Sequence, residues 1–470
     1  MSRRVSDARL VAYDVLRDVD ERDAFANLAL ASHIRTARLD GRDAGLATEL
    51  AAGTLRNQGR YDRIIELASG RPTDKIDART LRVLRLGAHQ LLAMRTATHA
   101  AVNESVELQR LGANPKAAGF VNAVLRTITR ETPEAWDERV GESARNLDEA
   151  IALRTSHPTW IVRAMRDALR AEGRDDELAA LLDADNASPA VNLVVLPGSP
   201  VDAETAAVLG TDTEIDRIIE ADGVSPIGMM LSRGNPADAI DAIDSPPGTI
   251  RVQDQGSQLA ALALTGATPV QPNERWLDLC AGPGGKTAIL AAEAAMQGAS
   301  LRANEVTPHR ADLVRQATEA FPELDIVSFD GRDDDAFGGD ERFDRILVDA
   351  PCTGLGALRR RPEARWRKQP SDLPELTALQ GELLDAAVRH LTVGGVLAYV
   401  TCSPHRAETR VVVDGLLKQH PELRELDAKA VLQSAARQPL DLAGEHLSAQ
   451  LWPHRHNTDA MFVALIERVA

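Results

Sequence analysis

Cysteine is scarce in this chain: only Cys280, Cys352 and Cys402 occur among 470 residues. A small, odd number of cysteines in a long chain argues against a disulfide framework. No two of them have the Cys-x-x-Cys spacing that is typical of structural zinc sites, so we expect no metal site. All three lie in the C-terminal part of the chain.

Long apolar runs are also missing. No stretch approaches the roughly 18 apolar residues that a membrane span needs, and no secretory h-region follows the N-terminus. We therefore expect a cytoplasmic protein with no membrane contact. We also expect the protein to be a monomer. A chain of 470 residues is too long for one ordinary domain, so two or three are expected.

Basic residues are fewer than acidic residues: the chain has 54 Lys and Arg and 70 Asp and Glu, which gives a net charge of −16. This balance argues weakly against a nucleic-acid partner. One local exception is the run 358–368, which holds six basic residues and one acid. The run is either a solvated loop or a phosphate-binding patch, and its candidate contacts are Arg359, Arg360 and Arg361.

Three predicted domains follow from the residue patterns, so the fold is expected to be multidomain. Residues 1–140 show helical apolar spacing and predict an all-α bundle. Residues 141–245 predict a small α+β segment with a strand at 191–196. Residues 246–470 alternate apolar strands with helices, which predicts an α/β domain with a mostly parallel sheet covered on both faces. Its strands are expected near 276–280, 301–304, 325–329, 345–349, 396–401 and 461–466.

A glycine-rich turn follows the first strand of the α/β region. Its sequence is Asp278-Leu-Cys-Ala-Gly-Pro-Gly-Gly-Lys-Thr. Glycines let the backbone approach a ligand closely, although the spacing does not fit a phosphate-binding P-loop. A tight structural turn would explain the glycines equally well if they stood alone.

Acidic residues at the predicted strand ends add weight to the ligand interpretation. Glu305 could accept hydrogen bonds from both ribose hydroxyls of a nucleoside cofactor, and Asp330 could meet an adenine amino group. A single acid at such a position is usually a helix cap or a turn residue. Four acids at the ends of four successive strands predict a nucleoside cofactor: Asp278, Glu305, Asp330 and Asp349.

Two cysteines occupy equivalent places in this pattern. Cys352 lies in Asp349-Ala-Pro-Cys-Thr-Gly and Cys402 in Thr401-Cys-Ser-Pro, each just past an apolar strand. A lone cysteine is most often a small buried hydrophobe. If the two strands are neighbours, both thiols face one crevice at the ends of the strands, beside the predicted cofactor site.

On these motifs, the chain resembles the RsmB (Fmu/Sun) family of bacterial ribosomal RNA cytosine-C5 methyltransferases. Its helical N-terminus, with 102–108 and 120–125, is similar to the NusB RNA-binding domain. The resemblance implies a Rossmann-like methyltransferase domain at 246–470 and S-adenosylmethionine as the cofactor. It implies cofactor contacts at Cys280, Ala281, Gly282, Pro283, Gly284, Gly285, Lys286, Glu305, Asp330 and Asp349.

The resemblance also implies that Cys402 is the nucleophile and that Cys352 helps to release the product. A thiolate that adds to C6 of cytosine makes C5 nucleophilic enough to accept a methyl group, which is covalent catalysis. Asp349 is placed to hold the N3 and N4 edge of the ring. RNA is then the expected partner, most simply 16S ribosomal RNA, and the arginines at 359–361 become candidate RNA contacts.

Other functions share parts of this pattern. A transfer RNA methyltransferase of the same group would carry the same motifs. A DNA cytosine methyltransferase would use the Pro-Cys cysteine as its nucleophile, and a non-enzymatic RNA-binding factor would need neither thiol. The chain departs from the family at three places: Gly282 replaces Ala, Thr353-Gly-Leu-Gly replaces Ser-Gly-Thr-Gly, and Asn457 replaces Gly in the C-terminal motif 452–459. We associate that last motif with the substrate side.

Overall fold

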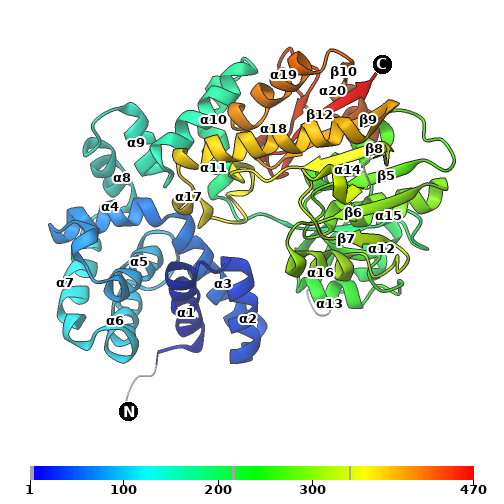
Figure 1. Cartoon of the computed structure of the whole chain (residues 1–470). Helices are drawn as coiled ribbons and strands as arrows, with labels where there is room; N and C mark the ends of the chain where they lie inside the picture. Colours follow the sequence, from blue (N-terminus) through cyan, green and yellow to red (C-terminus); the bar gives the residue numbers. More distant parts are fainter. Residues whose placement is uncertain (1–4, 214–216, 338–339) are drawn as a thin grey trace. The chain divides into compact units, whose positions relative to one another are not determined.

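The computed structural model describes residues 5–213, 217–337 and 340–470 (Figure 1). The chain forms two compact units. The first comprises Met1–Arg163, Asp185–Ala187 and Leu358–Lys368, and the second comprises Ala164–Ala184, Ser188–Ala357 and Gln369–Ala470. The predicted boundaries after residues 140 and 245 do not coincide with this division, because the predicted middle segment is shared between the units. No helix of the described residues is long and apolar enough to cross a membrane.

The first unit is helical, as the apolar spacing predicts. In α5, Leu81, Leu84 and Ala88 are buried in one core with Val121 and Leu125 of α7. Asp77 caps α5 by accepting a hydrogen bond from the backbone N–H of Thr80, which fixes where the helix begins. The long helices of this unit are α1 (Asp7–Arg22), α2 (Ala26–Ala37), α3 (Gly41–Arg56), α4 (Gln58–Ser69), α5 (Ala78–Leu92), α6 (Thr98–Leu108), α7 (Ala118–Ile128), α8 (Pro133–Glu142) and α9 (Leu147–Arg154).

A small antiparallel sheet opens the second unit, with the order β2-β3-β1-β4. Alternate side chains of β1 point to opposite faces: Leu193 packs with α12, whereas Val194 packs with α14 and α15. One face of the sheet therefore packs in a small core within this segment, and the other face packs on helices of the larger unit, so the predicted α+β segment folds as part of that unit. Its elements are β1 (Val191–Val195), α12 (Ala203–Gly210), β2 (Ile218–Glu220), β3 (Gly228–Arg233), α13 (Pro236–Asp241), β4 (Ile250–Val252) and α14 (Gln255–Gly266).

The main sheet of the second unit has the order β10-β12-β9-β8-β5-β6-β7. The five strands from β9 to β7 are parallel, and β12 lies antiparallel between β9 and β10. The mostly parallel α/β prediction is thus confirmed. The strands are β5 (Arg275–Asp278), β6 (Ser300–Asn304), β7 (Asp325–Val327), β8 (Phe343–Asp349), β9 (Leu391–Thr401), β10 (Leu423–Leu426), β11 (Ala449–Gln450) and β12 (Phe462–Arg468).

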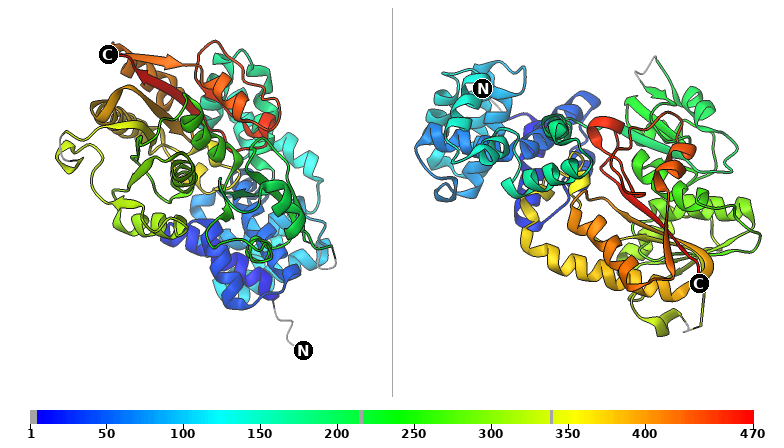
Figure 2. Two further views of the ribbon diagram at one scale, coloured as in Figure 1. Left: turned by 90° about the vertical axis from the view of Figure 1, so that its right-hand side faces the viewer. Right: turned by 90° about the horizontal axis from the view of Figure 1, so that it is seen from above.

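Helices cover both faces of this sheet, because its central strands are apolar on both sides. Along β9, Ala398 and Val400 pack in the core that contains α14, whereas Leu397 and Tyr399 pack in the core that contains α18. Figures 1 and 2 show α18 running along the sheet. The covering helices are α14, α15 (Gly285–Gln297), α16 (Pro308–Ala317), α18 (Leu373–His390), α19 (Arg410–Gln419) and α20 (Ala428–Ala435).

Candidate active site

The parallel strands bring the predicted site residues to one edge of the sheet. β5, β8 and β9 are direct neighbours, with Asp278 paired to Leu347 and Asp349 paired to Val400. Their carboxyl ends therefore lie side by side, and ligands of such sheets bind at that edge. The glycine turn follows β5, and the cysteine-bearing turns follow β8 and β9.

The two cysteines meet, as expected of adjacent strand ends. The Sγ atoms of Cys352 and Cys402 are 3.4 Å apart, and both residues are half-buried. The hydrogen bond between the thiols, followed by burial, raises the pKa of Cys352 well above its ordinary value. Cys352 therefore stays a neutral thiol near pH 7, in contact with the second sulfur.

A half-buried ion pair lies beside the thiols. Lys286 Nζ is 2.7 Å from Asp349 Oδ2. Burial alone would lower the pKa of Lys286, but the Asp349 carboxylate more than offsets it and holds this pKa above its ordinary value. Cys402 contributes to the same upward shift. Lys286 is therefore charged and close enough to Cys402 to favour a thiolate there.

The glycine turn is tied to the second strand through Glu305. Its carboxylate accepts hydrogen bonds from the backbone N–H groups of Gly282 (3.1 Å) and Thr307 (3.0 Å). A side chain at 282 would clash with this carboxylate. Gly284 has φ 102°, which side chains rarely adopt, so the turn needs glycine there. The turn thus holds Glu305 against the start of α15.

The remaining strand-end acids differ in their surroundings. Asp278 is buried and accepts a 2.7 Å hydrogen bond from the Thr287 hydroxyl, and burial raises its pKa to about 7. Asp330 lies three residues beyond β7, where a two-point hydrogen bond from Arg332 lowers its pKa to about 2. Cys280 packs against the core on the α18 side, and burial raises its pKa well above the ordinary value.

One buried acid of this site escaped the sequence analysis. Glu408 is fully buried and accepts hydrogen bonds from Thr353 and Ser403, the residues that follow the two cysteines. In the sequence it is one acid in a polar turn six residues after Cys402, and no spacing marks it out. Its partners are known only once β8 and β9 are paired.

The basic run 358–368 is not a solvated loop. Arg365 is fully buried and donates hydrogen bonds to the backbone oxygens of Arg56, Ser156 and Asp185 and to the side chain of Asn186. All of these residues belong to the first unit. This part of the run is therefore a structural strap that is held by helix ends and turns of the helical unit.

The three arginines proposed as RNA contacts lie at the start of that run. Arg359 is only 4% exposed, and Arg360 is half-buried. Arg361 is exposed, with its guanidinium 5.1 Å from the centre of the Phe25 ring. In this conformation Arg361 is the one of the three that is open to a phosphate group.

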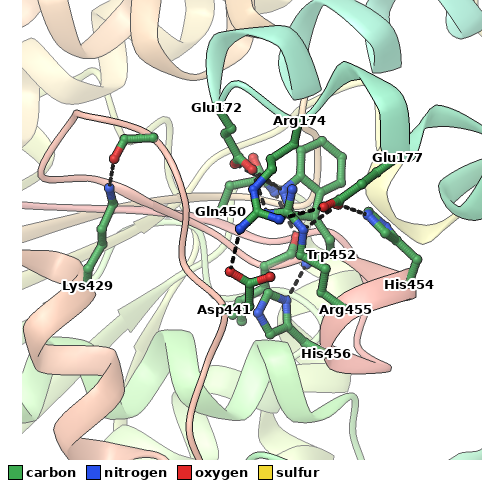
Figure 3. Close-up of polar contacts among 12 residues, drawn as sticks. Glu172, Arg174, Glu177, Lys429, Asp441, Gln450, Trp452, His454, Arg455 and His456 are labelled. Atoms are coloured by element: carbon green, nitrogen blue, oxygen red, sulfur yellow. Dashed lines mark hydrogen bonds and ion pairs between the residues drawn. The ribbon is translucent and has the colours of Figure 1, made fainter.

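The C-terminal motif 452–459 binds protein side chains (Figure 3). Arg455 lies 2.7 Å from a carboxylate oxygen of Glu172 and 2.6 Å from one of Glu177, and His454 also contacts Glu177. The buried Trp452 donates its indole N–H to Glu172. These contacts hold the motif against the segment that follows α10 (Thr159–Ala171). Its association with the substrate side stays a prediction.

The substitution of Asn457 for glycine has a backbone explanation. Asn457 ends α21 (Pro453–His456) with φ 54°, in the left-handed region. Asparagine and glycine are the residues that tolerate this conformation best. The exchange therefore keeps the shape of the turn.

Comparison with known proteins agrees with this fold. A family model described as 16S rRNA methyltransferase RsmB/F matches residues 267–467, and the NusB family model matches residues 6–130. The Ribosomal RNA small subunit methyltransferase B of Pseudomonas putida is 33% identical over 98% of both chains. A Mycobacterium tuberculosis protein named as a methyltransferase is 45% identical over 99% of this chain and 98% of its own. The crystal structure of PH0851 has the same fold, with a TM-score of 0.76 and 21% identity over 99% of both chains. The chain therefore belongs to the RsmB/F family of 16S ribosomal RNA methyltransferases and carries a NusB-family domain at its N-terminus.

Proposed function

We propose that the protein transfers a methyl group from S-adenosylmethionine to C5 of a cytosine in 16S ribosomal RNA, with Cys402 as the covalent nucleophile. The observation that carries this proposal is the pair of sulfur atoms 3.4 Å apart at the ends of β8 and β9. The half-buried Lys286–Asp349 ion pair lies at the same edge of the sheet. The name of the Pseudomonas putida relative, a ribosomal RNA small subunit methyltransferase, supports ribosomal RNA over transfer RNA as the substrate.

The residues around the glycine turn fit a nucleoside sulfonium cofactor. Asp278 Oδ1 is buried and accepts no side-chain hydrogen bond within the described part of the chain, so the turn offers an acceptor. Glu305 and Asp330 add carboxylates that suit ribose hydroxyls and an amino group, and the backbone N–H groups at the start of α15 can face a ligand. Gly284 lets this turn pack closely against Ala317 of α16. When bound there, the sulfonium group supplies the electrophilic methyl.

Cys402 and its neighbours supply the nucleophile. The positive charge of Lys286 favours the thiolate form of Cys402. That thiolate adds to C6 of the cytosine and shifts electron density to C5, where the new carbon–carbon bond forms. Asp349, which is paired to Lys286, is proposed to hold the N3 and N4 edge of the ring with its carboxyl group.

Cys352 serves the last step. After methyl transfer, the C5 proton must leave to a base, and its electrons form the C5=C6 double bond while the C6–S bond breaks. Cys352 is a neutral thiol in contact with the Cys402 sulfur, so it can donate a hydrogen bond to the sulfur as it leaves. Its contribution is therefore expected in product release and not in attack.

RNA recognition is proposed for the NusB-family domain and for Arg361. An exposed arginine on this acidic chain can contact a phosphate group, and each such contact releases counterions. Arg359 and Arg360 are less accessible in this conformation.

Bisulfite sequencing of total RNA from a deletion strain tests the proposal. Loss of 5-methylcytosine at a position in 16S ribosomal RNA, restored by the wild-type chain and not by Cys402→Ala, is the expected result. A lost signal in transfer RNA alone, or restoration by Cys402→Ala, would contradict it.

A further inference from the structure

The carboxylate of Glu408 joins the two turns that carry the cysteines. Its Oε1 accepts the backbone N–H of Thr353 at 2.7 Å. Its Oε2 accepts the hydroxyl of Ser403 at 2.7 Å and also the hydroxyl of Thr353. The two hydroxyl oxygens are themselves 3.1 Å apart. All of these groups are buried, so water does not compete for them.

The bonded residues are the direct neighbours of the reacting thiols. Thr353 follows Cys352 at the end of β8, and Ser403 follows Cys402 at the end of β9. One side chain thus restrains both turns at the residue next to each sulfur. The sheet pairing of β8 and β9 ends before the cysteines, and a backbone hydrogen bond from Gly356 to the Cys402 oxygen (2.8 Å) is a second link between the two turns.

Further hydrogen bonds hold this carboxylate in place. Tyr399 on β9 donates its hydroxyl to the backbone oxygen of Glu408 at 2.7 Å. Gln380 on α18 donates to the backbone oxygen of Pro351 at 2.8 Å and lies 3.4 Å from Glu408 Oε1. Glu408 is therefore anchored from two elements, which gives it little freedom to follow a moving turn.

We propose that Glu408 is a positioning residue that sets the spacing of Cys352 and Cys402 by binding the turn after each of them. This inference rests on the proposed function, because it concerns how the two thiols take part in methyl transfer and release. Glu408 acts on the positions of the thiols through Thr353 and Ser403, and its charge also helps to raise the pKa of Cys352.

The chemistry of the three donors explains why a carboxylate suits this place. An amide N–H can only donate, so Oε1 must be an acceptor, whereas the two hydroxyls can donate or accept. In Glu408→Gln the amide oxygen can keep the Thr353 N–H while its NH2 group donates to the two hydroxyls. In Glu408→Ala the Thr353 N–H loses its acceptor, and the two hydroxyls keep only each other as partners, which loosens both turns.

Kinetics of the full-length chain with S-adenosylmethionine and 16S ribosomal RNA test the inference. Glu408→Ala should lower kcat by roughly 10-fold to 100-fold, because displacements of about 1 Å at reacting atoms have effects of this size. The KM for either substrate should stay within about 2-fold of wild type, since the cofactor turn is held by other contacts. Glu408→Gln should recover most of the lost kcat.

The matched control is Glu274→Ala. Glu274 is also a buried carboxylate of this unit, bonded to Arg345 and Trp276, but it lies at the start of β5 and away from the cysteine turns. If Glu274→Ala lowers kcat as much as Glu408→Ala, loss of stability explains the effect and the inference is wrong. An unchanged kcat in Glu408→Ala, or no recovery in Glu408→Gln, would also overturn it.

A second measurement needs no RNA and separates the inference from the proposed function. Diamide oxidises two neighbouring thiols to a disulfide and is itself reduced to the hydrazine. With wild type and Glu274→Ala, peptide mass spectrometry should show a Cys352–Cys402 disulfide that forms several-fold faster than in Glu408→Ala. Equal rates in wild type and Glu408→Ala would overturn the inference, whereas an inactive wild type that still shows the difference would overturn only the proposed function.

Discussion

Replacement of Arg365 by alanine should destabilise the helical unit strongly, although the residue belongs to a basic run. Its guanidinium is fully buried and donates at 2.9 and 3.1 Å to the backbone oxygens of Arg56 and Ser156, and at 2.7 Å to Asp185 and Asn186. Each buried acceptor that is left without a donor costs about 1–3 kcal/mol. Burial also lowers the pKa of Arg365 to about 10, so the side chain is charged at pH 7. The desolvation of this charge in the wild type offsets part of the stability that its hydrogen bonds contribute.

Because these effects partly cancel, we expect a loss of about 3–5 kcal/mol in the free energy of unfolding of the first unit. A loss of that size should lower its Tm by roughly 6–20 °C. Differential scanning calorimetry of the full-length chain measures this shift. The matched control is Arg361→Ala, which removes an exposed arginine of the same run and should change the Tm by less than about 2 °C.

For RNA binding we expect the reverse order of effects: the change at Arg361 should matter more than the change at Arg365. Arg361→Ala should weaken RNA binding and flatten its salt dependence, since a phosphate contact is lost. The structural interpretation of the strap is refuted if Arg365→Ala keeps the wild-type Tm while it weakens RNA binding.

Two further predictions concern the cofactor side of the site. Glu305→Ala and Asp330→Asn should each weaken S-adenosylmethionine binding by about 1.5–3 kcal/mol, and unchanged affinity of both variants in titration calorimetry would remove these acids from the site. Burial raises the pKa of Asp278 to about 7 from 3.8, so the folded chain keeps a proton that the unfolded chain has released across that interval. Stability of the wild type should therefore fall as the pH rises from about 4 to 7 and then level off, whereas Asp278→Asn should lack this component. Urea unfolding at pH 5 and pH 8 compares the two, and identical pH dependence in both proteins would argue against the raised pKa.

Much of the catalytic unit could be predicted from sequence, because its strands are short apolar runs between helical periods. The placement of Cys352 and Cys402 at neighbouring strand ends followed from two equivalent motifs, and the pairing of β8 with β9 confirms it. The family resemblance and the fold class are likewise confirmed by the family matches and the full-length relatives.

Other features depend on partners that are distant in the sequence. Arg365 is indistinguishable from its basic neighbours until oxygens from residues 56, 156 and 185 surround it. Glu408 gains its importance only when the turns after β8 and β9 meet. The predicted domain boundary after residue 245 separates β1 from β4, the strand with which it pairs.

The two cysteines give the most direct test of the account. Cys402→Ala and Cys352→Ala are each incubated with 16S ribosomal RNA and S-adenosylmethionine and then separated on a denaturing gel. In the proposed mechanism Cys402 attacks C6 and Cys352 assists release. Cys352→Ala should then accumulate a covalent protein–RNA adduct, and Cys402→Ala should form no adduct and no 5-methylcytosine. An adduct from Cys402→Ala and none from Cys352→Ala would reverse the roles of the thiols and contradict the account.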